Sequence, residues 1–190
     1  MKIGTRSVLY GAHQFIIHPL FVLAAWIKLY GCPTWRELIA IIIHDWGYWG
    51  SPNMDGPEGE EHPAWAAAKL HKLGDKWYRF EGKRRSGKIA WLRAGNEVLY
   101  HSRFWAKKHG AEPSRLCWAD KLGTAWYPTF LWCFLTRLTG EIHEYMDQRK
   151  YEIHLGINMP TDTAWKFFKR YKEMAAGWIV EQVENDRVRA

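Results

Sequence analysis

The chain has 190 residues, 47% of them hydrophobic, which suits one domain (1–190) that buries a core of its own. Its three cysteines form no CxxC pair and exclude a disulfide framework, so we expect a reducing, cytoplasmic setting. No secretory signal is recognisable, and the most apolar stretches, residues 19–27 and 125–135, fall short of the roughly 20 residues of a transmembrane segment.

The net charge of +7 favours anionic partners such as phosphate esters, nucleotides, nucleic acid or acidic lipid. Basic residues are concentrated between Lys69 and Arg93, where only Asp75 and Glu81 oppose them. Two interpretations stay open for this stretch, a solvated helix face or a rim that attracts phosphate. Because no helix-turn-helix or RNA-binding signature is present, nucleic acid is possible as a partner but not indicated.

Apolar residues recur at spacings of three and four, and alternation is rare, which predicts an all-α fold of about six or more helices. The first helix is expected over residues 8–30, bent at Pro19 because proline removes a backbone donor. The second is expected from Thr34 to about Asp45 and begins with the capping-box sequence 34-TWRE-37.

Residues 47–61 hold four glycines and two prolines and predict an ordered loop. A third helix is expected from Pro63 to a stop at Gly74, followed by a basic linker over residues 79–88. The remaining helices are expected up to about Lys108, from a Ser114 cap through residues 115–123 and on toward Leu138, and from Thr161 or Asp162 to about Val188.

Side chains that suit metal ions occur on five of these segments, and they are His18, His44, Asp45, His62, His101 and Asp120. A helical bundle that points imidazoles and carboxylates inward is a common metal site. Imidazole with carboxylate suits Fe, Mn, Zn, Ni or Co, and no cysteine lies near enough to indicate a structural zinc. A buried Asp45, which follows three isoleucines, would need a cation or several donors.

Three segments in order resemble the HD-domain superfamily of metal-dependent phosphohydrolases. They are 18-HPLFVLAAW-26, 43-IHDWG-47 with its His-Asp pair, and 118-WADKLG-123 with the closing aspartate. The resemblance covers about residues 8–135 and implies a helical bundle, with residues 139–190 as a helical extension packed on it.

The resemblance also implies the ligands. Members with one metal use two histidines and two aspartates, here His18, His44, Asp45 and Asp120. Members with two metals add two histidines, here His62 and His101, and Asp45 then bridges the ions. Two alternatives stay open: His71 competes in the same interval, and His13 competes with His18, from which it would diverge by about 140° on a helix. His109 precedes Gly110 at an expected helix end, so we expect it to be exposed.

The implied reaction is hydrolysis of a small phosphate ester, possibly a nucleotide, by one or two divalent ions, with Mg also possible. Lys121 beside the closing aspartate, together with Arg84, Arg85 and Arg103, would bind the substrate anion. Asp55, in the acidic loop, is a further candidate for a catalytic carboxylate, although the loop also fits a merely solvated segment.

Two other functions remain open at the level of sequence. Some relatives in the same superfamily hold a di-iron centre that activates oxygen, and they can use the same ligand set. The chain could also be a non-enzymatic basic helical module that binds an acidic partner.

Overall fold

The structure, a computed structural model, describes residues 1–80, 85–146 and 163–189. Within these ranges all regular elements are helical and none is a strand, which confirms the predicted all-α class. The elements are α1 (Ile3–Tyr10), α2 (Ile17–Tyr30), α3 (Trp35–Ile43), the 3-10 helix η1 (Trp46–Tyr48), α4 (Pro57–Glu60), α5 (His62–Phe80), α6 (Arg85–Leu99), α7 (Arg103–Lys108), α8 (Arg115–Ala125), α9 (Thr129–Thr139), α10 (Ile142–Tyr145) and α12 (Ala164–Arg189).

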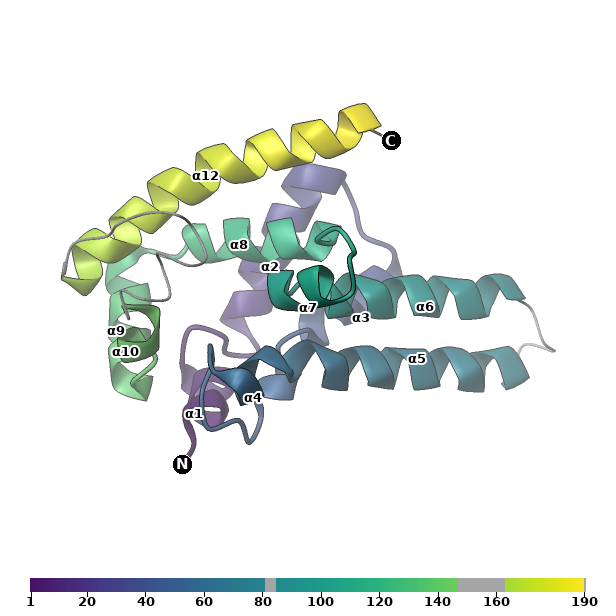
Figure 1. The fold of residues 1–190 in the computed structure, drawn as a ribbon, viewed down its shortest axis with the longest axis horizontal. Coiled ribbons are helices and arrows are strands. Elements are labelled where there is room, and N and C mark those ends of the chain that lie inside the picture. The colour runs from purple at the N-terminus through teal and green to yellow at the C-terminus, as the bar shows by residue number, and fades with distance from the viewer. Residues whose placement is uncertain (81–84, 147–162, 190) are drawn as a thin grey trace.

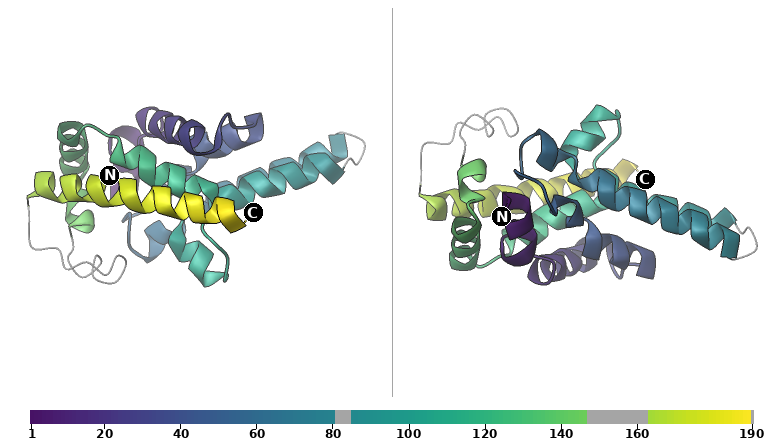
Figure 2. Two further views of the ribbon diagram at one scale, coloured as in Figure 1. Left: turned by 90° about the horizontal axis from the view of Figure 1, so that it is seen from above. Right: turned by 90° about the horizontal axis from the view of Figure 1, so that it is seen from below.

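The core lies around α2 and α8, which cross at the centre of the molecule, with α12 running over α8 on the outside (Figure 1). Fully buried side chains of α2 and α8, such as Val22 and Leu116, share one apolar cluster with Ile179 of α12. The helices α5 and α6 form an antiparallel pair that extends away from this core (Figures 1 and 2). No helix in the described ranges has the length and apolarity to cross a membrane.

The prediction of one bent helix over residues 8–30 is wrong, because the chain breaks between α1 and α2. At Gly11 an added Cβ would lie 2.1 Å from Oε1 of Glu141, so the chain turns where it meets this buried carboxylate. Pro19 lies in the first turn of α2, where its missing N–H has no helical partner to lose, so it causes no bend.

The predicted caps of α3 and α8 are confirmed. The Thr34 amide donates to Glu37 Oε2 at 2.7 Å while the Glu37 amide donates to the Thr34 hydroxyl at 3.3 Å, and Ser114 accepts from the Cys117 amide. The capped helix α3 ends at Ile43, so that His44 and Asp45 lead directly into η1.

Several predicted boundaries are wrong: α6 begins at Arg85, inside the linker expected over residues 79–88. The stretch from the Ser114 cap toward Leu138 forms two separate helices, α8 and α9. Helix α5 continues past Gly74 to Phe80, because this glycine lets α6 approach closely: a Cβ there would lie 2.8 Å from the Cβ of Trp91. Helix α6 ends at Leu99, so His101 lies in the turn before α7 rather than inside a helix. Ser102 follows His101 in this turn, and its side chain caps α7 by accepting a hydrogen bond from the Trp105 amide.

The C-terminal part follows Gly140, which ends α9 with a positive φ of 87°. Helix α12 begins at Ala164; the predicted start at Thr161 or Asp162 lies outside the described residues. Phe168 of α12 stacks on Trp132 of α9 with 4.2 Å between ring centroids. This helix therefore covers α8 and α9 together.

Candidate metal centre

Four histidines and two aspartates from separate elements meet where α2, α3, α5 and α8 approach one another. They are His18 in the first turn of α2, His44 and Asp45 between α3 and η1, His62 at the start of α5, His101 after α6, and Asp120 in α8. All are buried except Asp120, which is partly buried. The structure thus brings together the whole predicted set, in two groups that could each hold a metal ion.

The first group consists of His18, His44, Asp45 and Asp120. His18 Nε2 lies 3.1 Å from Asp45 Oδ2 and 3.0 Å from Asp120 Oδ1. His44 Nε2 lies 3.2 Å from the same Asp45 oxygen and 3.3 Å from His18 Nε2. Ligands about 2.1 Å from one ion would be separated by roughly 3.0–3.4 Å, so this spacing fits a shared cation.

The second group consists of His62, His101 and the other oxygen of Asp45. Asp45 Oδ1 lies 3.6 Å from His62 Nε2 and 3.5 Å from His101 Nε2, and the two imidazole nitrogens are 3.1 Å apart. The two oxygens of Asp45 therefore face two different pairs of imidazoles. This is the arrangement of a carboxylate that bridges two ions.

Three of the imidazoles are oriented in the same way, by a bond to the carbonyl three residues earlier. His44 Nδ1 contacts Ile41 O at 2.7 Å and His62 Nδ1 contacts Gly59 O at 2.6 Å. His101 Nδ1 contacts Val98 O likewise. Because a carbonyl can only accept, each Nδ1 must donate, and each neutral ring then presents a free Nε2 lone pair to the centre.

The carboxylates carry the clearest sign that the centre suits a cation. Asp45 Oδ2 and Asp120 Oδ1 are buried oxygens that accept no hydrogen bond, although imidazole nitrogens lie close to both. Burial alone would raise the pKa of Asp45, but the charges of His44 and His13 hold it well below the usual range. Both aspartates are thus anionic at neutral pH, and the donor set fits divalent ions of the transition series.

The imidazoles of the two groups differ in electrostatics. Burial opposes protonation of His44, yet Asp45 and Asp120 raise its pKa to about 10. Burial and the neighbouring His101 lower the pKa of His62 well below the usual range. Proton and metal compete for the same nitrogen, so the group with both carboxylates attracts cations more strongly.

Two residues of η1, Tyr48 and Gly47, pack against His62 of the second group. Tyr48 stacks on His62 with 3.7 Å between ring centroids and 17° between the planes. Gly47 packs directly against the backbone of His62, since a Cβ there would lie 1.9 Å from His62 O. Only a loop was predicted here, and the contact shows that η1 packs on the start of α5.

The competing histidines have other partners. His13 Nδ1 lies 3.4 Å from Oε2 of Glu141, and His71 packs on Gly95 outside both groups. His109 is exposed, as expected, and stacks on Trp105.

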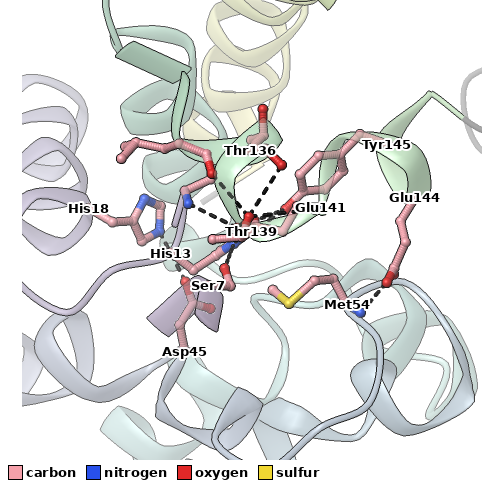
Figure 3. A network of polar contacts seen from close by, with 12 residues as sticks. Ser7, His13, His18, Asp45, Met54, Thr136, Thr139, Glu141, Glu144 and Tyr145 are labelled. Atoms are coloured by element: carbon pink, nitrogen blue, oxygen red, sulfur yellow. Dashed lines mark hydrogen bonds and ion pairs between the residues drawn. The ribbon is translucent and has the colours of Figure 1, made fainter. Parts of the chain in front are cut away.

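Glu141, which the sequence analysis missed, is fully buried and joins several polar side chains near His18 (Figure 3). We call Ser7, His13, Thr139, Glu141 and Tyr145 the Glu141 network. The ring centroids of His13 and His18 are 5.3 Å apart, so the network borders the metal centre. The short motif TGEIHEY contains the partners Thr139 and Tyr145 but gives no signal of this role, because the Ala12 amide and His13 come from the distant N-terminal part of the chain.

The proposed substrate-binding residues lie at different distances from the centre. Lys121 is partly buried next to Asp120, and Arg103 is exposed two residues after His101. Asp55 is partly buried, and its amide donates to Oε2 of Glu144 at 3.0 Å. Arg85 begins α6, whose 15 residues extend over about 21 Å, so it lies far from the ligands. Arg84 lies outside the described residues.

No protein-family model matches the chain, and no curated protein sequence or solved structure is significantly similar to it. The assignment of a function therefore depends on the residues of the centre itself.

Proposed function

We propose that the chain is a metal-dependent phosphohydrolase of the HD-domain type that holds two divalent ions. His18, His44, Asp45 and Asp120 would bind one ion, and Asp45, His62 and His101 the other. The observation that carries the proposal is the position of Asp45, whose two oxygens face two separate pairs of imidazoles. The resemblance of the three sequence segments to the HD superfamily supports the same conclusion.

The charge of the ligand set favours an anionic substrate. Four neutral imidazoles and two carboxylates contribute a charge of about −2, so two bound dications leave the centre positive. Such ions supply an activated water and neutralise charge on phosphoryl oxygens. The Nδ1 bonds of His44, His62 and His101 to carbonyls hold the rings in one orientation for ligation.

Other residues of the chain have proposed roles around the substrate. Lys121 and Arg103, beside Asp120 and His101 in sequence, would bind phosphoryl oxygens. Asp55 would orient or deprotonate water, and Glu144 holds its loop by accepting from the amides of Met54 and Asp55. Arg85, at the start of α6, lies in a more distant part of the surface, where it could contact only a substrate of greater length.

The metals that we propose are Mn, Fe, Co, Ni or Zn, because four imidazoles suit these ions better than Mg, which prefers oxygen ligands. Small phosphate-containing anions such as nucleotides are the proposed substrates. The proposed compartment is the cytoplasm, where Cys32, Cys117 and Cys133 would remain free thiols.

The test is a metal analysis of protein purified without chelator, followed by assays of Mn- and Co-loaded protein on nucleotides and on generic phosphate mono- and diesters. We expect metal-dependent hydrolysis that Asp45→Ala abolishes. Anaerobic purification with iron quantitation and spectroscopy is done in parallel. A di-iron centre that consumes oxygen and hydrolyses no ester would instead establish an oxygenase, and protein without metal or activity would indicate a binding module.

A further inference from the structure

The α5–α6 pair presents a basic surface that leads toward the metal centre. Helix α5 begins at the candidate ligand His62. At its other end, the α5–α6 pair lies away from all the other helices (Figures 1 and 2). A long molecule that lies along α5 would therefore extend to His62, the candidate metal ligand at the first residue of this helix.

Four cations form one stripe along α5, namely Lys69, Lys72, Lys76 and Arg79, all exposed. Their spacing of three, four and three residues keeps them on one face over about 15 Å, and this face lies roughly 60° around the helix from His62. None of the four forms an ion pair within the described parts of the chain. The one acid of α5, Asp75, is instead paired with Lys88 of α6 at 2.8 Å.

Exposed tryptophans connect this stripe to the centre. Trp65 continues the stripe one turn after His62, is 47% exposed and lies 5.1 Å from Nζ of Lys69. Trp46 and Trp49, in and after η1, are 40% and 61% exposed, and η1 packs on the start of α5. A groove of cations with aromatic rings is the usual way to bind a single nucleic-acid strand without sequence preference.

We propose that the stripe binds the phosphates of a single-stranded polynucleotide, that Trp65 and the η1 tryptophans stack on its bases, and that the metal centre cleaves its phosphodiesters. This inference rests on the proposed function and names the substrate class of the same site. A length of about 15 Å matches four or five phosphates of a stacked strand. The acidic α4, with Glu58 and Glu60, precedes His62 and would repel a strand from that side, so the strand approaches along α5.

Binding is measured by fluorescence anisotropy with labelled single-stranded DNA and RNA of about 20 nucleotides, in chelator so that the strand stays intact. The test variant is Lys69→Gln/Lys72→Gln/Lys76→Gln. The control variant, Lys28→Gln/Lys166→Gln/Lys169→Gln, removes the same charge from exposed positions on α2 and α12. We expect the test variant to bind at least tenfold more weakly at about 0.1 M salt, with a salt slope lower by about two, and the control to bind like wild type.

The stacking contact is tested separately, because Trp65→Ala leaves the charge unchanged. We expect it to weaken binding about fivefold or more without a change in the salt slope. Circular dichroism of each variant verifies the fold. No saturable binding, or equal losses in the two triple variants, would overturn the inference.

Two further measurements separate this inference from the proposed function. The first is hydrolysis of bis(p-nitrophenyl) phosphate by metal-loaded protein. If the protein hydrolyses this ester but neither binds nor cuts the oligonucleotides, the proposed phosphohydrolase function stands and the inference of a polynucleotide substrate is refuted. Vesicles of phosphatidylserine and phosphatidylcholine serve as a rival anionic surface. Sedimentation with these vesicles in the absence of oligonucleotide binding would assign the stripe to a lipid surface and refute the inference as well.

Discussion

Two buried clusters of carboxylates and histidines lie side by side in this protein, and they differ in how their polar atoms are satisfied. In the Glu141 network, Oε1 of Glu141 accepts from the Thr139 hydroxyl at 2.6 Å and the Ala12 amide at 3.3 Å. Its Oε2 accepts from the Tyr145 hydroxyl at 3.1 Å and lies near His13 (Figure 3). The network is closed, with donors from α9, α10 and the α1–α2 turn.

The candidate metal centre has the same kinds of side chain, but its hydrogen bonding is open, in the sense that two buried carboxylate oxygens lack a donor. Asp45 Oδ2 and Asp120 Oδ1 accept no hydrogen bond from the residues that the structure describes. A buried carboxylate without donors is costly unless a cation neutralises it. Burial of acid with histidine thus has two outcomes here, a closed network of hydrogen bonds around Glu141 and an open cluster that could hold metal ions.

The largest effect is expected for Asp45→Asn, which removes the shared charge from both groups. We expect loss of both ions and a decrease in ester hydrolysis of at least 1000-fold. Metal analysis and kinetics measure the two effects, with Glu112→Gln as a control at an exposed acid. Retention of two ions by Asp45→Asn would show that this carboxylate is no bridge.

A smaller loss is expected for His101→Gln, because His101 belongs to the second group of candidate ligands and not to the first. One ion should remain at His18, His44 and Asp120, so the metal content should fall from two ions per chain to one. The remaining ion should still raise the thermal midpoint, since ligand at about 100 times its Kd stabilises by about 2.7 kcal/mol. Loss of both ions would mean that the two groups form one site.

Glu141→Gln should reverse the pattern and affect stability rather than metal. The glutamine side chain replaces one acceptor oxygen with an NH2 group, so it cannot accept all the hydrogen bonds from Ala12, Thr139 and Tyr145. We expect this to lower the free energy of unfolding by about 1–3 kcal/mol. Denaturant unfolding measures the cost, and the metal content should stay at two ions per chain. If Glu141→Gln is as stable as wild type but lacks metal, Glu141 is needed for metal binding rather than for stability.

The smallest effect is expected for Glu37 in the capping box, a partly buried carboxylate near the surface that accepts hydrogen bonds from several donors. Burial would raise the pKa of Glu37, but the Thr34 amide and the Arg115 guanidinium lower it below 4.5. Its stabilisation is therefore present above pH 4.5 and is lost as the pH falls through the lowered pKa. Glu37→Gln should cost up to about 1 kcal/mol at pH 7.

Urea unfolding of wild type and Glu37→Gln at pH 7 and at about pH 3 measures this dependence. The difference between the two proteins should shrink at the lower pH. A difference that grows on acidification would contradict the direction of the shift.

Local patterns predicted much of this structure. The capping box at Thr34 and the cap at Ser114 involve residues three apart, so the sequence contains all of their geometry. The six metal-ligand candidates came from the ordered resemblance to the HD superfamily, and the structure brings them together in two groups.

Contacts between distant segments were not predictable in the same way. Gly11, where the chain breaks, lies against Glu141, 130 residues later, and Gly74, which α5 passes, lies against Trp91. In a sequence, a glycine can indicate the end of a helix or a position where another segment packs closely. Which of the two applies depends on the residue that lies against it in the fold. The closed network of Glu141 was missed for the same reason.

The central claim is that Asp45 bridges two ions, and anomalous X-ray scattering from crystals of Mn-loaded protein tests it most directly. We expect two peaks about 3.5–4 Å apart, one on each side of the Asp45 carboxylate. The first should lie among His18, His44 and Asp120, and the second between His62 and His101. A single peak, or peaks that do not contact Asp45, would contradict the claim.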